Sequence, residues 1–387
     1  MRSVTNRART GGARKIVRMT TLTVRDLNRA TLARQMLLAR ERHAVPAAVE
    51  RLGGLQAQLA RPPFVALWVR LDGFTRDALL DAVRARAVVR ATMMRATLHL
   101  VSADDFARLR PALQPMLTAA MRGVLRDRFM AENLGAVTAA ARPLLAAEPR
   151  TFEVLRAELS RAFPEIDERA LGYAVRMHLP LVQVPNDRSA WGWETGPAFA
   201  LADDWLGTPV PSEPAPDAMR ALVRRYLGAF GPATPADAGA WCGLRGLKAT
   251  FDAMRDELAM FRDARGRELF DLPEAPRPGE DVDAPPRLLP EFDTLVLAHD
   301  DRSRVIADAH RARVVSKNLQ VAATFLVDGV VAGTWKAARV RGEAVLTATP
   351  FASVSARVRR ALEPEGDALL RFVEPDAKGY AVRFAAA

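Results

Sequence analysis

The first hundred residues change from a helical to an extended pattern of apolar positions. Apolar residues recur every three to four positions in three stretches, which predicts three amphipathic helices. These helices begin after Thr23, at Pro46 and after Thr75, and the second is expected to run on to Leu59 before Pro62 and Pro63 stop it. Extended segments follow at 88–90 and 95–101. Three helices and then strands is the order of a winged helix.

The same order recurs twice along the chain. In the second copy, helices follow the N-cap residues Thr151 and Asp167, and strands at 181–184 and 191–194 are expected to form a hairpin, or wing. In the third copy, helices are expected at 222–230, 238–242 and 247–258, ahead of a hairpin at 260–270. The three copies share little sequence, but their repetition indicates a tandem architecture.

The last hundred or so residues follow a different, two-residue period. A Pro-rich stretch from Pro273 to Pro290 is expected to be a linker. Strands are predicted at 294–298, 323–327, 330–335, 343–347 and 380–384, with one helix near 354–362. Asp328-Gly329 between two strands is a strong hairpin signal.

The expected fold is α+β, with tandem winged-helix (helix-turn-helix) units and a C-terminal β-rich domain. The predicted organisation is a disordered basic tail (1–20), a first winged helix (21–110), a second (111–212), a third (213–275) and the β-rich domain (276–387). The tail has no apolar core of a secretory signal, and a basic arm that grips phosphate is the alternative to a floppy tail.

Charge and composition narrow the class of partner. The chain has 387 residues, 49% hydrophobic, and a formal net charge of +11, which favours a polyanion. The preference for Arg over Lys is also what a GC-rich genome produces, but that bias does not explain the excess of base over acid. No apolar run reaches the roughly 18 residues of a membrane span. The single cysteine, Cys242, cannot form a disulfide within the chain, is expected to be buried in packing, and favours a cytoplasmic setting.

Familiar catalytic constellations are missing from the sequence. It contains no nucleotide-binding glycine loop, no GxSxG elbow and no paired histidines, so neither a cofactor nor a metal is expected. The polar residues of interest are Gln56 and Gln58, at the predicted end of the second helix. Two amides converging on one point would hold and orient a water, whereas solvated or backbone-capping glutamines at a helix end are the structural alternative.

Four segments together carry a resemblance to a known family. They are Leu55-Gln56-Ala57-Gln58, residues 90–99 (RATMMRATLH), residues 289–293 (LPEFD) and residues 327–335 (VDGVVAGTW). They resemble the winged-helix family of bacterial proteins that includes the AlkZ DNA glycosylases, and the resemblance runs from about Leu22 to Phe384. It implies a C-shaped clamp of winged helices around double-stranded DNA, consistent with the repeat pattern.

The resemblance also implies an activity and a site. The family hydrolyses the N-glycosidic bond of alkylated purines, including bulky adducts and interstrand crosslinks, and its signature is Gln, an apolar residue, then Gln. Carried over to this sequence, Gln56 and Gln58 become the catalytic residues. An alkylated purine that is already cationic leaves as a neutral base without a general acid. The motif has no nearby lysine for a Schiff base, so a monofunctional enzyme that leaves an abasic site is expected.

The sequence also offers candidate DNA contacts and leaves one alternative function open. Arg61, Arg90 and Arg95 are candidates for phosphate contact, with solvated surface arginine as the alternative, and His99 is either close to the DNA or a buried structural histidine. The alternative function is a non-enzymatic winged-helix DNA-binding protein or transcriptional regulator. We expect a monomer, associated with the nucleoid in the cytoplasm, whose task is either general repair or self-resistance to a DNA-alkylating toxin.

Overall fold

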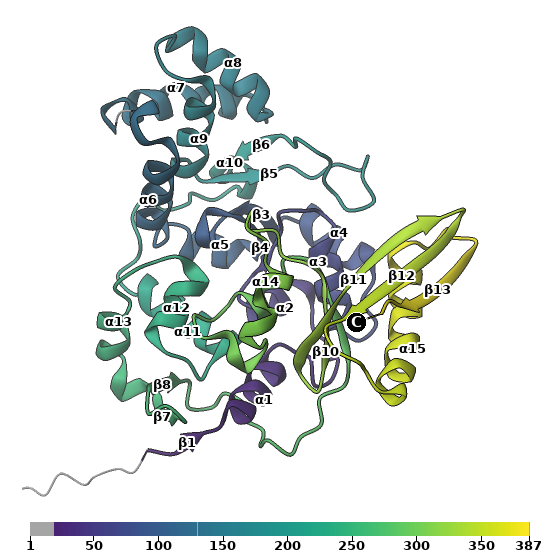
Figure 1. The fold of residues 1–387 in the computed structure, drawn as a ribbon. Helices are drawn as coiled ribbons and strands as arrows, with labels where there is room; N and C mark the ends of the chain where they lie inside the picture. Colours follow the sequence, from purple (N-terminus) through teal and green to yellow (C-terminus); the bar gives the residue numbers. More distant parts are fainter. Residues whose placement is uncertain (1–18, 130, 387) are drawn as a thin grey trace, which may run out of the picture.

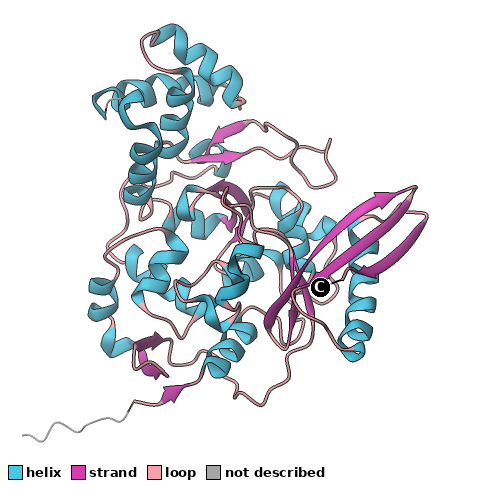
Figure 2. Ribbon diagram, in the orientation of Figure 1, coloured by secondary structure: helices cyan, strands magenta, loops and turns pink. Residues whose placement is uncertain are grey.

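A computed structural model describes residues 19–129 and 131–386, and the chain is a mixed α+β fold (Figures 1 and 2). Most of the expected tail, 1–20, lies outside these residues. The helices are α1 (Val24–Arg34), α2 (Val45–Arg51), α3 (Pro62–Trp68), α4 (Arg76–Arg84), α5 (Ala103–Leu109), α6 (Gln114–Leu125), α7 (Leu134–Ala147), α8 (Phe152–Ala162), α9 (Glu168–His178), α10 (Ala202–Leu206), α11 (Ala218–Phe230), α12 (Pro235–Cys242), α13 (Lys248–Ala253), α14 (Arg311–Val314) and α15 (Ala356–Val373).

The strands form three sheets. They are β1 (Thr21–Leu22), β2 (Leu55–Gln56), β3 (Val88–Thr92), β4 (Leu98–Ser102), β5 (Leu181–Gln183), β6 (Phe199–Leu201), β7 (Ala259–Asp263), β8 (Glu268–Asp271), β9 (Arg287–Leu289), β10 (Thr324–Val327), β11 (Val330–Val340), β12 (Glu343–Pro350) and β13 (Gly379–Phe384).

Helix starts follow the predicted capping residues. The hydroxyls of Thr23, Thr75 and Thr151 and the carboxylate of Asp167 each accept a backbone N–H in the first turn of α1, α4, α8 and α9. Pro46 lies in the first turn of α2, as predicted. The prediction that Pro62 and Pro63 end a helix is wrong: they open α3, because the first turn of a helix does not need their missing N–H groups.

One sheet joins the first two predicted units. Its strand order is β2-β4-β3-β5-β6, and Ala91 of β3 is paired with Val182 of β5. The expected wing strand at 191–194 is wrong. The strand β6 pairs with β5 instead, while Trp193 is buried and directs its indole N–H at the carbonyl of Gln183.

The hairpin predicted for the third unit is present, and a further strand joins it. β7 and β8 are antiparallel, as predicted, and β1 adds to β7 in parallel. The helix expected at 247–258 is shorter than predicted, since α13 ends at Ala253 and a 3₁₀ turn follows at Arg255–Glu257.

The C-terminal sheet has the order β13-β12-β11-β10-β9, with α15 packed beside it (Figure 1). The predicted hairpin at Asp328-Gly329 is confirmed, with Val327 paired to Val330. The strand expected at 294–298 is wrong: Asp293 accepts the N–H of Leu295 and starts a 3₁₀ turn. Part of the expected linker, Arg287–Leu289, is instead strand β9.

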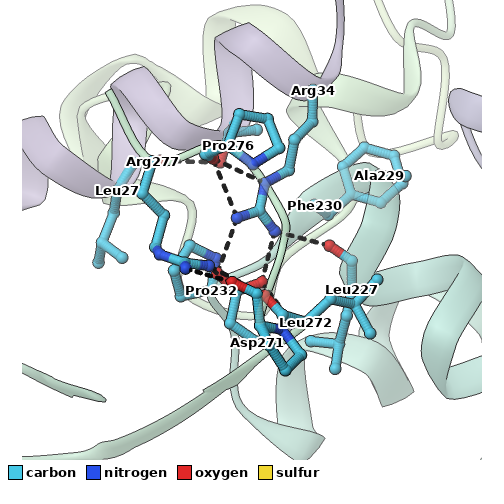
Figure 3. Close-up of polar contacts among 12 residues, drawn as sticks. Leu27, Arg34, Leu227, Ala229, Phe230, Pro232, Asp271, Leu272, Pro276 and Arg277 are labelled. Carbon is cyan, nitrogen blue, oxygen red and sulfur yellow. Dashed lines mark hydrogen bonds and ion pairs between the residues drawn. The ribbon is translucent and has the colours of Figure 1, made fainter. Parts of the chain in front are cut away.

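A buried ion pair fastens α1 to the third unit (Figure 3). Both Nη atoms of Arg34 donate to the carboxylate of Asp271, at 2.6 and 2.8 Å. Arg34 also donates to the carbonyl of Leu227 in α11, and Arg277 donates to Oδ2 of Asp271, which also accepts from Arg34. Because both partners of the ion pair are excluded from solvent, this contact fixes the N-terminal helix against α11 and β8.

Candidate functional site

Gln56 of the sequence motif lies on a strand and Gln58 lies in the bend just after it, and neither is on a helix. Helix α2 ends at Arg51, and Gly53 and Gly54 then take left-handed backbone angles, with φ of +70° and +83°. The chain turns there and enters β2, where Gln56 is paired with His99 of β4. The predicted helical placement of the motif is therefore wrong, because two consecutive left-handed residues end the helix before the motif begins.

This placement brings both side-chain amides into contact with residues 95–98: Gln56 contacts the side chain of Arg95 and Gln58 contacts the backbone of Leu98. The pairing continues past β2, since the N–H of Ala57 donates to the carbonyl of Leu98 at 2.7 Å. Ala57 is fully buried in the core, Gln56 is 8% exposed, and Gln58 is exposed. We call Gln56 and Gln58 the glutamine pair.

Each amide of the glutamine pair is held by a partner that only donates. Arg95 Nη2 donates to Oε1 of Gln56 at 2.7 Å, and the backbone N–H of Leu98 donates to Oε1 of Gln58 at 2.8 Å. A guanidinium and a backbone N–H have no acceptor to offer, so both carbonyl oxygens must face these donors. A carbonyl oxygen has two lone pairs, and one remains on each amide for a further donor.

Arg95 connects the glutamine pair to the third unit. It lies in the 3₁₀ turn Met94–Ala96 between β3 and β4, with a left-handed φ of +54°. Its Nη1 donates to the carbonyl of Trp241 in α12. Burial lowers the pKa of Arg95 to about 10, so the guanidinium remains charged at neutral pH. The phosphate contact expected of Arg95 stays a prediction, and in this structure its guanidinium is engaged with Gln56 and Trp241.

Arg90 also supports the motif and does not face solvent. It is buried, and its Nε and Nη2 donate to the carbonyl of Ala57 at 2.9 and 2.7 Å. The guanidinium lies over the ring of Trp193, and burial lowers its pKa to about 10. Arg90 therefore holds the backbone between the two glutamines, and the expected phosphate contact is not available to it.

His99 has the structural role that the sequence left open as an alternative. Its ring is completely buried, with Nδ1 at 3.0 Å from the carbonyl of Thr97. Because that carbonyl only accepts, the ring proton lies on Nδ1. Burial, together with the charge of Arg95, lowers the pKa of His99 to about 3. The ring is thus neutral, and the expected DNA contact does not hold.

Unlike Arg90 and His99, which are buried, Arg61 is partly exposed, in the same class as Arg95. Its side chain is 32% exposed, and Nη2 donates to Glu291 at 3.1 Å. Two residues further on, Asp293 forms a buried bidentate pair with Arg70 of the first unit. The segment 289–293 therefore packs against the unit that carries the glutamine pair.

The structure also adds a residue that sequence reasoning missed. Arg176 of α9 donates through Nε to the hydroxyl of Thr92, the last residue of β3, at 3.0 Å. It also lies close enough to Arg90 for its charge to lower the pKa of that residue. The motif gave no signal for it, because the contact crosses 84 residues of sequence.

The remaining predictions on individual side chains concern packing and metals. Cys242 is buried, as predicted, and burial raises the pKa of its thiol to about 11. Among residues 19–129 and 131–386, no three His, Cys, Asp or Glu side chains cluster as metal ligands would. Within the same residues, no helix has the length and apolar character needed to cross a membrane.

Comparison with known proteins identifies the family to which the chain belongs. Residues 49–372 match the family model described as DNA glycosylase AlkZ-like. A relative from Streptomyces sahachiroi, described as an interstrand DNA cross-link repair glycosylase, is 27% identical over 361 residues, which cover 86% of this chain and 92% of the relative. The solved structure of the Streptomyces sahachiroi DNA glycosylase AlkZ superposes with a TM-score of 0.77 at 23% identity, over 95% of this chain and 100% of that one. The match of the family model over most of the chain, together with the shared fold, shows that this protein belongs to the AlkZ-like family of DNA glycosylases.

Proposed function

We propose that this protein is a monofunctional DNA glycosylase that hydrolyses the N-glycosidic bond of cationic alkylated purines and leaves an abasic site. One observation carries the proposal: both carbonyl oxygens of the glutamine pair are fixed by donor-only partners, and each keeps one free lone pair. A water molecule has two O–H donors, one for each of these oxygens. Its own lone pair is then free to attack C1′ of the damaged nucleotide. The bond from C1′ to the purine nitrogen breaks, the base leaves neutral, and the excess proton of the added water passes to solvent.

The chemistry of the amides restricts the substrate. An amide has no useful basicity and does not take a proton from the attacking water before the bond to the base has weakened. The nearest histidine, His99, is buried and neutral with a pKa of about 3, so it supplies no proton to a leaving base. A purine alkylated at N7 or N3 needs no such proton, because it departs as a neutral base. Unmodified purines should therefore be left intact.

The oxygens of the glutamine pair also suit the transition state. Loss of the base generates positive charge on the sugar, as in glycoside hydrolysis. Carbonyl oxygens that are already oriented stabilise that charge without reorganising during the reaction. The relative described as an interstrand cross-link repair glycosylase suggests bulky adducts and crosslinks as substrates here too.

The proposed architecture is a C-shaped clamp on double-stranded DNA. We assign 21–110, 111–212 and 213–275 to three winged-helix units, of which the first two share one sheet, and 276–387 to the β-rich domain. Arg61, on the surface close after the motif, is retained as a phosphate contact. A clamp built from tandem units needs no second copy, so we propose a monomer, acting at the nucleoid in the cytoplasm.

Release of a damaged base tests the proposal. The purified chain is incubated with duplex DNA that contains N7-methylguanine and, separately, with a nitrogen-mustard crosslinked duplex, and hot alkali then reveals abasic sites. Strand breaks at the lesion, with unmodified purines untouched, are the expected result. Tight binding to undamaged DNA of one sequence, with no base release from either duplex, would instead identify a DNA-binding regulator.

A further inference from the structure

A hollow on the second predicted unit is lined by arginines. It has a volume of about 330 Å³ and lies between the end of α6 and the helices α8 and α9. The arginines are Arg128, Arg156, Arg169 and Arg176, and Tyr173 stands among them. Among its described lining residues there is no carboxylate. We call this hollow the arginine cavity.

The charges in the arginine cavity are poorly neutralised by the chain. Within the described residues, one of these four arginines forms an ion pair: Arg156 lies 3.7 Å from Glu168. Arg128 folds back onto carbonyl oxygens at the end of α6. Of the buried arginines elsewhere in the fold, Arg34 and Arg70 are paired with aspartates, whereas Arg90 donates to a backbone carbonyl. The cavity differs in that four arginines line one hollow, which leaves positive charge available for an anion.

Arg176 shows the imbalance most clearly. Its side chain is largely withdrawn from water, and this burial lowers its pKa. Its hydrogen bond to the hydroxyl of Thr92 uses Nε. The two Nη atoms carry the fork that binds phosphate oxygens in pairs. Holding a guanidinium in such a place without an acidic partner is costly unless a ligand supplies the negative charge.

The packing of α9 also opens the cavity to Arg156. Gly172 lies inside α9, where glycine stabilises a helix less than alanine does. A Cβ at this position would meet Cγ and Cδ of Arg156 at 2.7 Å. The absent side chain thus allows Arg156 to lie flat across α9 and to line the cavity.

The arginine cavity is connected to the glutamine pair through two short links. Arg176 holds Thr92, which ends β3 just before the turn that carries Arg95. Arg176 also lies near Arg90, which donates to the carbonyl between Gln56 and Gln58. We propose that the arginine cavity binds a phosphodiester of the DNA strand that passes the glutamine pair. This inference rests on the proposed function, since it takes DNA as the ligand.

The test uses the salt dependence of DNA binding. Removing one arginine that binds a phosphate lowers the slope of log K against log salt concentration by about one. The full chain and its Arg128→Gln and Arg169→Gln variants are titrated against a fluorescein-labelled undamaged duplex over a series of NaCl concentrations. Arg161→Gln is the matched control, because Arg161 is exposed on α8 of the same unit but does not line the cavity.

The expected result is a slope smaller by about one in each cavity variant and unchanged in the control. An unchanged slope in either cavity variant overturns the proposal, and so does an equal drop in Arg161→Gln, which would indicate a diffuse basic surface. Binding is measured without catalysis, so absence of base release by the wild type would refute the proposed function while the slopes still decide on the cavity.

Discussion

Arg95 Nη2 donates a 2.7 Å hydrogen bond to Oε1 of Gln56, and Nη1 of the same guanidinium donates to the carbonyl of Trp241. These contacts join three distant parts of the chain: the strand that carries the glutamine pair, the turn between β3 and β4, and helix α12. The orientation of the Gln56 amide thus depends on how the first unit packs against the third. We regard Arg95 as a positioning residue, because it acts on the reaction through Gln56.

Arg95→Lys should lower the rate of base release more than it lowers DNA affinity. A lysine ammonium is a compact charge that lacks the planar fork needed to reach both carbonyl oxygens in this geometry. A hydrogen bond to a charged group contributes about 1.5–3 kcal/mol, which corresponds to a loss of roughly 10- to 150-fold in the single-turnover rate. Single-turnover kinetics and DNA titration on the same variant separate the two effects. Weakened binding with an unchanged rate would restore Arg95 as a phosphate contact.

Acidification should destabilise the fold through His99. Its pKa of about 3 in the folded chain lies below the ordinary value of 6.5, so the unfolded chain binds the proton more readily. Stability is therefore complete above pH 6.5 and is lost progressively as the pH falls toward 3. Between pH 7 and pH 5 the loss from this ring is about 2 kcal/mol.

Urea denaturation at the two pH values measures this loss, with His99→Gln as the comparison. The variant should lose about 2 kcal/mol less than the wild type over the same interval, because its side chain does not titrate. Equal losses in the two proteins would mean that His99 is not the group responsible.

Removing Asp271 should strongly destabilise the protein. It neutralises Arg34 inside the structure and also accepts from Arg277, so Asp271→Ala leaves a buried guanidinium without its counter-charge. Such a change costs about 3–5 kcal/mol. Asp367→Ala is the matched control, since its pair with Arg371 is exposed and should contribute less than about 1 kcal/mol. Similar urea midpoints for the two variants would contradict this account of how α1 is held.

Local signals predicted the starts of the helices well and the position of the motif poorly. A capping hydroxyl such as that of Thr23 acts within one turn, so the sequence alone reveals it. The prediction of a helix through Leu55 failed because apolar residues keep a helical spacing in the sequence after the helix itself has ended. The overlooked signal was Gly53-Gly54, which allows the chain to turn where the motif begins.

The burial of Arg90 and His99 could not be predicted in the same way. Both lie on strands whose every residue is buried, so the alternation of inner and outer positions gives no guidance. The strand that carries Arg90 is also flanked by a strand from the second unit, because Ala91 is paired with Val182. Contacts over such distances in the sequence leave no local pattern, and arginines in a basic chain are equally suited to the surface.

The most direct test of the account is single-turnover release of N7-methylguanine by Gln56→Ala and Gln58→Ala. Gln320→Ala serves as the control, because Gln320 is exposed on the C-terminal part of the chain. If the two amides orient one water, each variant should be slower by on the order of 100-fold. The double variant should be little slower than either single one, because the two residues act as a unit. Release at the wild-type rate by both single variants, with DNA affinity intact, would show that the glutamine pair is not the catalytic site.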